Sequence, residues 1–207
     1  MSFVRYDESA IITALEQFPV RLRATFAALC AERLLPAYIL FGEQIDACDS
    51  RALIAILQRI WQYLEGNEMS AEELQTNLDT CIDLIPKEDE GEWVEQKAYA
   101  EDASSAVAYA LRTIQNGEPQ EAAWAARHAY ETLDYYLTYR EGPHTTDISE
   151  IERTMTHPLV QAELLRQQRD LDDLRKIAKT DDQAPLLAEL RSRAQADAIR
   201  FFGEVDS

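Results

Sequence analysis

The chain has 207 residues and a formal net charge of −18 at pH 7, so it can bury one core but lacks the basic surface that nucleic-acid binders need. Hydrophobic residues make up 46% of it, as in soluble proteins, and no uncharged apolar run approaches the ~20 residues that cross a bilayer. Only 6 glycines and 7 prolines, with abundant Ala, Leu and Glu, favour long helices with short connections.

Apolar residues recur at helical spacing from the start of the chain. The pattern predicts a first helix over residues 7–17 and a second over 19–35. Pro19 suits the first turn of the second helix, where the backbone N–H has no partner to lose. Pro36 disfavours helical geometry in the residue before it and cannot donate a hydrogen bond. We therefore expect a junction between two helices at Pro36, with a third helix beginning there.

The strongest helical pattern follows in residues 53–64. Its apolar positions repeat at i, i+3, i+4, i+7 and i+11, which turns one stripe toward a core. The stripe consists of Leu53, Ile56, Leu57, Ile60 and Leu64. Gly66 and Asn67 end this helix. Ser70 and Glu73 then form a capping-box pattern, in which the serine accepts from a backbone N–H and the glutamate reaches back, and a fifth helix follows.

Long helical segments continue through the second half of the chain, over residues 93–115, 119–139, 158–179 and 184–202. The first two are joined by a short connection and must therefore lie antiparallel as a hairpin. Residues 140–147 form the longest loop-like run and are the place where a subdivision of the chain is expected. No segment shows the sustained period-two alternation of a strand.

These patterns together predict an all-α fold. We expect one domain over residues 1–207, a bundle of about eight or nine helices with antiparallel helical hairpins. The C-terminal helical pair is expected to pack onto the rest of the bundle.

Cysteine usage and the N-terminus point to a cytoplasmic protein. The N-terminus lacks the basic segment and apolar run of a secretory signal. Cys30, Cys48 and Cys81 are odd in number and have no CxxC spacing. Reduced, mostly packed thiols are the interpretation that this pattern favours.

The acidic excess is concentrated in one segment. Residues 65–102 hold 13 acids and 2 bases, net −11, whereas residues 1–64 hold 7 acids and 6 bases, net −1. Such an acidic face attracts a basic partner and repels nucleic acid, although solubility alone also accounts for it. We expect neither nucleic acid nor a membrane as a partner.

The apolar run 26–41 is interrupted by Glu32 and Arg33. On a helical wheel Arg33 falls on a core stripe and Glu32 lies just beyond its edge. The stripe consists of Phe18, Leu22, Phe26 and Leu29. Adjacent residues do not face each other on a helix, so the two charges are not each other's partners. A core arginine needs a carboxylate or carbonyls from elsewhere, or must reach solvent at the helix end. Structural tethering is the favoured interpretation, and ligand binding is the alternative.

The same stretch carries a recognisable motif. It reads C-x-ER-x-x-P-x-Y-x-x-F, formed by Cys30, Glu32, Arg33, Pro36, Tyr38 and Phe41. This resembles the signature of the bacterial YjaG-like family, catalogued as domain of unknown function 416, and the likeness spans roughly residues 15–180. The resemblance implies an all-α cytosolic bacterial protein with no established activity and no catalytic residues to carry over. Structural or ligand-binding candidates are Glu32, Arg33, Pro36, Tyr38 and Trp61.

His128 and Glu131 are the weak candidates for a metal site. They lie one turn apart in an H-x-x-E pattern within residues 119–139 and can share a metal. A di-metal carboxylate bundle, however, needs E-x-x-H on two helices with further glutamates. An aromatic, hydrogen-bonded helix contact that includes Trp124 and Tyr135 explains the same face more simply. We therefore assign no metal, and no cofactor is expected because nucleotide-binding glycine motifs are also missing.

No catalytic constellation is visible in the sequence, so no catalytic residue is assigned. The first hypothesis is a non-enzymatic, soluble interaction protein whose acidic face, residues 65–102, binds a basic protein partner. A homodimer is a second candidate assembly. The alternative hypothesis is a small-molecule or metal-dependent enzyme with an inter-helix pocket near Arg33 or His128. A purely structural scaffold would leave the same pattern in the sequence as the first hypothesis.

Overall fold

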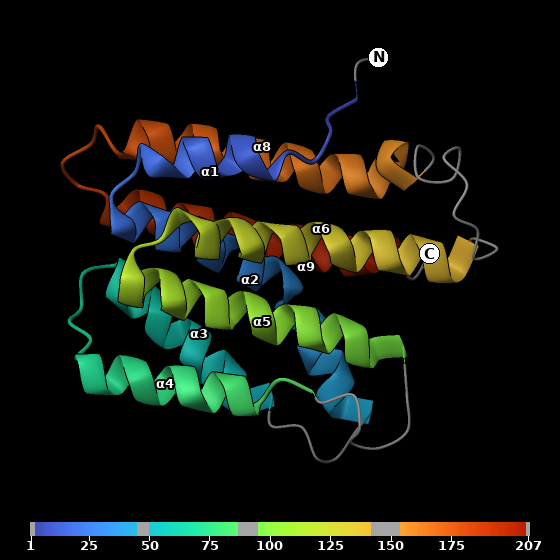
Figure 1. The fold of residues 1–207 in the computed structure, drawn as a ribbon, viewed down its shortest axis with the longest axis horizontal. Helices are drawn as coiled ribbons and strands as arrows, with labels where there is room; N and C mark the ends of the chain where they lie inside the picture. Colours follow the sequence, from blue (N-terminus) through green and yellow to red (C-terminus); the bar gives the residue numbers. More distant parts are fainter. Residues whose placement is uncertain (1–2, 45–49, 87–94, 142–153, 206–207) are drawn as a thin grey trace.

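The described part of the chain is built from helices packed in layers (Figure 1). The computed structural model describes residues 3–44, 50–86, 95–141 and 154–205, and every regular element in these ranges is helical. The elements are α1 (Glu8–Glu16), α2 (Val20–Gln44), α3 (Ser50–Leu64), α4 (Ala71–Asp83), α5 (Glu95–Asn116), α6 (Pro119–Glu141), α8 (Pro158–Ile177) and α9 (Ala184–Val205). The predicted all-α fold is confirmed. In Figure 1, α1 and α8 run along one edge of the molecule and α4 along the opposite edge.

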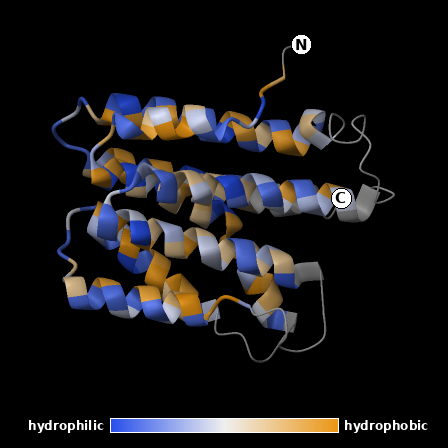
Figure 2. Cartoon of the chain, viewed as in Figure 1, coloured by the Kyte–Doolittle hydropathy of each residue, from blue (hydrophilic) through white to orange (hydrophobic). Residues whose placement is uncertain are grey.

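Helix α2 is the centre of the bundle. Residues 24–34 are buried without interruption, because α2 packs against α3, α5, α6, α8 and α9. A helix enclosed on all sides can be apolar around its whole circumference. Val20–Glu43 is long and apolar enough to cross a membrane, but 78% of its most apolar window is buried inside the bundle. This segment is therefore the core helix of the bundle, and apolar residues gather toward the interior of the bundle (Figure 2).

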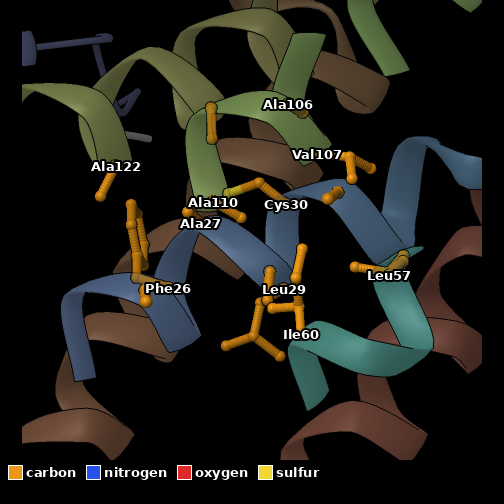
Figure 3. Close-up of a cluster of buried hydrophobic side chains, with 14 of the residues drawn as sticks. Phe26, Ala27, Leu29, Cys30, Leu57, Ile60, Ala106, Val107, Ala110 and Ala122 are labelled. Atoms are coloured by element: carbon orange, nitrogen blue, oxygen red, sulfur yellow. The ribbon is translucent and has the colours of Figure 1, made fainter. Parts of the chain in front are cut away.

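Small side chains let α5 and α6 approach α2 closely. Ala106 and Ala110 of α5 and Ala122 of α6 gather around Phe26 and Ala27 of α2 (Figure 3). All five side chains are fully buried. Interiors of this kind are packed as tightly as organic crystals, so larger side chains at these alanines would force the helices apart.

The predicted helix junction at Pro36 is wrong. Helix α2 continues through Pro36 and ends at Gln44. The missing N–H removes one hydrogen bond from the helix, a local cost of about 3 kcal/mol. Leu34 and Tyr38 are buried on either side of the proline, and the Tyr38 hydroxyl donates to the Leu84 carbonyl at 2.7 Å. Tertiary packing therefore outweighs the local preference of proline.

Half of the predicted capping box forms. The Ser70 hydroxyl accepts from the Glu73 backbone N–H at 3.1 Å and begins α4 as expected. The Glu73 carboxylate does not reach back but binds Arg59, whose Nη2 donates to Oε2 at 2.9 Å. This hydrogen bond lowers the pKa of Glu73. The charged partner from α3 competes successfully with the neutral backbone group.

Two expectations fall outside the described residues. The predicted start of a helix at Trp93 is one of them, and α5 is described from Glu95. The other is the subdivision of the chain near residues 140–147, where α6 is described as far as Glu141. The subdivision stays a prediction.

Gly117 closes the antiparallel hairpin of α5 and α6. Its φ of +74° lies in the left-handed region that favours glycine, and a Cβ added there would lie 3.0 Å from Val20 Cγ2. The Gly117 N–H donates to the Thr113 carbonyl at 3.0 Å, which satisfies one carbonyl at the end of α5. The glycine is therefore needed for both its conformation and its size.

Gly117→Ala is expected to lower the free energy of unfolding by about 1–2 kcal/mol from the left-handed backbone alone. The contact with Val20 adds to this loss. Urea denaturation measures the total, and the same substitution in a Val20→Ala background isolates the backbone share because the steric contact is gone. An alanine variant as stable as the natural chain would contradict the left-handed conformation.

Candidate functional site

Arg33 lies in the closed core and is neutralised by two carboxylates of α8. Its side chain is 1% exposed. Nη1 donates to Asp170 Oδ2 at 2.7 Å, and Nη2 donates to Glu163 Oε1 at 3.0 Å and contacts Cys30 Sγ at 3.4 Å. Burial alone would lower the pKa of Arg33, but the two carboxylates outweigh burial and raise it above its usual value. The guanidinium is therefore a permanent buried charge that joins α2 to α8.

One of these carboxylates, Asp170, and the nearby Asp173 tie α8 to α9. Asp170 Oδ1 accepts from Arg193 Nη2 at 2.9 Å, and Arg193 Nη1 donates to Asp173 Oδ2 at 2.7 Å. Burial acts to raise the pKa of Asp173, but hydrogen bonds from Lys176 and Arg193 outweigh burial and hold that pKa below its usual value. Charges from three helices thus alternate in one network.

Glu32 points away from Arg33, toward α9. Its Oε1 accepts from Arg191 Nε at 2.9 Å, and its Oε2 accepts from Gln195 Nε2 at 3.3 Å. Arg191 also lies over the ring of the buried Trp61, with its guanidinium carbon 5.4 Å from the ring centroid. The contacts of Glu32 and Trp61, like those of Arg33, are with other parts of the chain, so their geometry describes a structural tether.

His128 and Glu131 are not brought together. His128 Nδ1 lies 2.6 Å from Asp102 Oδ1 on α5, while Glu131 Oε1 accepts from Arg127 Nε at 2.6 Å. The second oxygen of Asp102 accepts from the Thr132 hydroxyl at 2.7 Å. Among the described residues, no group of three His, Cys, Asp or Glu side chains is placed to hold a metal. This cluster is therefore a polar link between α5 and α6.

Asp102 was missed in the sequence, although the hairpin pattern contained the signal. It lies 15 residues before Gly117, and Thr132 lies 15 residues after it. Residues equidistant from the turn of an antiparallel hairpin come face to face. His128 is one helical turn from Thr132 on the same face. The pairing can thus be derived once the turn is placed at Gly117.

Aromatic rings complete this face and pack helices together. The Tyr109 ring of α5 lies against His128 and Trp124, with centroid separations of 5.5 Å and 5.3 Å. Farther along, Tyr135 of α6 meets Tyr99 of α5 edge to face at 5.8 Å. Such contacts stabilise a helix pair beyond the area that they bury. The aromatic, hydrogen-bonded contact expected from the sequence is present.

The outer surface of α4 carries an acidic stripe, formed by Glu72, Asp79 and Asp83. Their spacing of i, i+7 and i+11 places them within about 40° of one another on the helix. All three are exposed, whereas Leu74, Leu78 and Cys81 turn the opposite side of α4 toward the core. Residues 65–86 contain no lysine or arginine. The stripe is therefore an exposed, described part of the acidic segment 65–102.

Comparison with known proteins places the chain in a family. The family model described as "Protein of unknown function (DUF416)" matches residues 10–201. The chain belongs to this family. The fold is also similar to the crystal structure of a DUF416 family protein from Shewanella baltica OS155, with a TM-score of 0.75 and 20% sequence identity, over 88% of this chain and 92% of that chain. No curated protein matched. Membership thus establishes the fold and leaves the function open.

The described thiols of this DUF416 protein are poor nucleophiles. Cys30 and Cys81 are both buried and free. Burial raises the pKa of Cys81 to about 12. Burial also raises the pKa of Cys30, against the opposing influence of Arg33. Because the thiolate is the reactive form, neither side chain is suited to catalysis at neutral pH.

Arg33→Ala is expected to lower the free energy of unfolding by about 3–5 kcal/mol, because it leaves Glu163 and Asp170 without their buried cation. Denaturant melts measure the loss. Arg127→Ala is the matched control, since Arg127 is 51% exposed and pairs with Glu131 on the same helix; such a pair contributes about 0.5 kcal/mol. A loss below about 1 kcal/mol at Arg33 would contradict a buried, paired guanidinium.

Stability is expected to decline at alkaline pH through the buried thiols. The contribution of the protonated Cys81 thiol to the free energy of unfolding is complete below the thiol's unfolded pKa of about 8.5. It is lost as the pH rises toward the folded pKa of about 12. By pH 10 the loss is about 2 kcal/mol for this thiol. Urea melts at several pH values should therefore show a shallower alkaline decline for Cys81→Ala than for the natural chain. Equal declines would be incompatible with a protonated folded thiol.

Proposed function

We propose that this protein is a non-enzymatic interaction protein that binds a basic protein segment through the acidic stripe of α4. The observation that supports this function is the alignment of Glu72, Asp79 and Asp83 on the exposed side of an edge helix. They extend over about 16 Å of helix, which suits several cations of one partner. Like charges held in a row attract such a partner and speed its association.

The residues next to the stripe support the same proposal. Ile82, 49% exposed, flanks the acids and offers a partner an apolar contact. Glu73 is paired with Arg59 and therefore adds little to the field. The three stripe acids thus carry the proposed contact.

The contacts of Arg33 do not favour the alternative of an enzyme pocket beside it. Its guanidinium is enclosed and meets carboxylates of the chain itself, so a ligand would have to displace them. His128 is partly exposed, but its Nδ1 is engaged by Asp102. A binding role is therefore proposed in preference to catalysis.

We infer further that the protein is a cytoplasmic bacterial member of the YjaG-like branch of its family. The motif of Cys30, Glu32, Arg33, Pro36 and Tyr38 supports the branch. Free buried thiols suit a reducing compartment. A homodimer is a compatible assembly, with the α4 stripe left open to a basic partner.

Binding of a fluorescent oligolysine peptide, followed by anisotropy, tests the proposed function. We expect binding at low salt that weakens as salt rises, since a Debye length of about 10 Å at 0.1 M screens exposed charges. The variant Glu72→Gln with Asp79→Asn and Asp83→Asn should weaken binding about fivefold or more.

The matched control removes the same number of charges elsewhere. The control variant carries Asp181→Asn, Asp182→Asn and Glu189→Gln. All three acids are exposed; the first two lie between α8 and α9 and the third lies on α9, away from α4. This control should bind the peptide within about twofold of the natural chain. Equal weakening by both variants would mean that net charge alone attracts the peptide and would overturn the proposal.

A further inference from the structure

The N-terminal strap, residues 3–6, enters the bundle beside α8 (Figure 1) and has no helical structure. Its second and fourth side chains, Val4 and Tyr6, are partly buried, whereas the other two are exposed. This alternation is typical of an extended chain laid on a surface, because successive side chains point to opposite sides. Asp7 then caps α1 by accepting from the Ala10 N–H at 3.0 Å, so the helix does not need the strap in order to begin.

The side-chain amide of Gln161 on α8 binds the backbone of the strap. Its Oε1 accepts from the Val4 N–H at 2.9 Å, and its Nε2 donates to the Val4 carbonyl at 2.8 Å. Nε2 also donates to the Met155 carbonyl at 2.7 Å, which fixes the orientation of the amide. Both bonds to the strap involve main-chain atoms alone. Recognition of an extended peptide uses main-chain hydrogen bonds of this kind for affinity.

Two side chains of the strap supply a sequence preference. The Tyr6 ring stacks on the Tyr130 ring of α6, with centroids 4.9 Å apart and planes within 7° of parallel. Val4 and Tyr6 both pack against an apolar cluster that includes Ala37, Leu133, Leu137, Val160 and Leu164. This cluster, with Tyr130 and Gln161, is called the strap groove below. Alternate side chains that enter such a surface select the sequence that it binds.

The strap is attached to the bundle at few points. A cleft of about 320 Å³ lies between the strap with α1 and the helix α8, and Val4, Arg5 and Tyr6 all line it. The strap is therefore not closely packed on α8 along its whole length. Terminal segments held by few contacts open at a small fraction of the free energy of global unfolding. The groove can thus be vacated while the bundle stays folded.

We infer that the strap groove binds an extended segment of a partner protein in which an aliphatic residue is followed two positions later by tyrosine. The strap carries this pattern in Val4 and Tyr6 and competes for the same groove. A tethered strap competes at an effective concentration on the order of millimolar, so the natural chain binds such a segment weakly. The groove lies at the edge of the bundle opposite to α4 (Figure 1) and is separate from the acidic stripe.

A fluorescent peptide with the sequence of residues 3–8 tests the inference by anisotropy against the full chain. The peptide contains one arginine and two acids, so the acidic stripe does not attract it. Tyr6→Ala in the full chain removes the stacked ring from the strap and should increase peptide affinity about tenfold. Val4→Pro removes the strap N–H that bonds to Gln161 and should act in the same direction.

Two further comparisons locate the bound peptide. A peptide with alanine in place of its tyrosine should bind the Tyr6→Ala chain at least about fivefold more weakly. Gln161→Leu, added to the Tyr6→Ala chain, should remove binding of the original peptide. The matched control adds the three stripe substitutions on α4 to the Tyr6→Ala chain instead and should leave this binding unchanged.

Three results would each overturn the inference. They are an unchanged peptide affinity when the strap is loosened, equal binding of the two peptides, and unchanged binding after Gln161→Leu. The first two need no substitution in the groove, so they remain decisive if Gln161→Leu does not fold. Val4→Pro provides the same two comparisons if Tyr6→Ala does not fold.

Discussion

The buried charge of Arg33 is the constraint on which the arrangement of α2, α8 and α9 depends. A guanidinium that is 1% exposed must have its charge neutralised by the chain itself. Glu163 and Asp170 are seven residues apart on α8, so they share one face and reach Arg33 together. This requirement sets both the rotation of α8 and its position along α2. Asp170 extends the constraint to α9 through Arg193.

Two kinds of packing therefore meet on α2. Toward α5 and α6 the contact is made by alanines and Phe26, where closeness matters and any polar group would be costly. Toward α8 and α9 the contact contains paired charges. These pairs add little net stability, but any packing of the helices that separates them leaves a buried charge without its partner and is therefore costly. Gln167 links the two regions, because its Nε2 donates both to the Ala126 carbonyl of α6 and to Glu163 of α8.

Much of this fold can be predicted from helical spacing, because α1, α3, α4 and α6 follow local apolar patterns. The continuation of α2 through Pro36 was not predicted, because proline locally disfavours a helix. Burial of the side chains on both sides of Pro36 outweighs that preference. The need of Arg33 for distant carboxylates was predictable from its position on a core stripe. The identity of those partners, more than 120 residues away, depends on tertiary packing. Asp102 was derivable from hairpin symmetry, whereas the hydrogen bonds between Gln161 and Val4 have no signature in the sequence.

A mutant cycle between Arg33 and its carboxylates tests the central claim most directly. It compares the unfolding free energies of the natural chain, Arg33→Ala, the pair Glu163→Gln with Asp170→Asn, and all three substitutions together. A buried network predicts that the combined variant loses at least about 2 kcal/mol less than the sum of the separate losses. Losses that add within about 0.5 kcal/mol would contradict the account, because independent groups behave in that way.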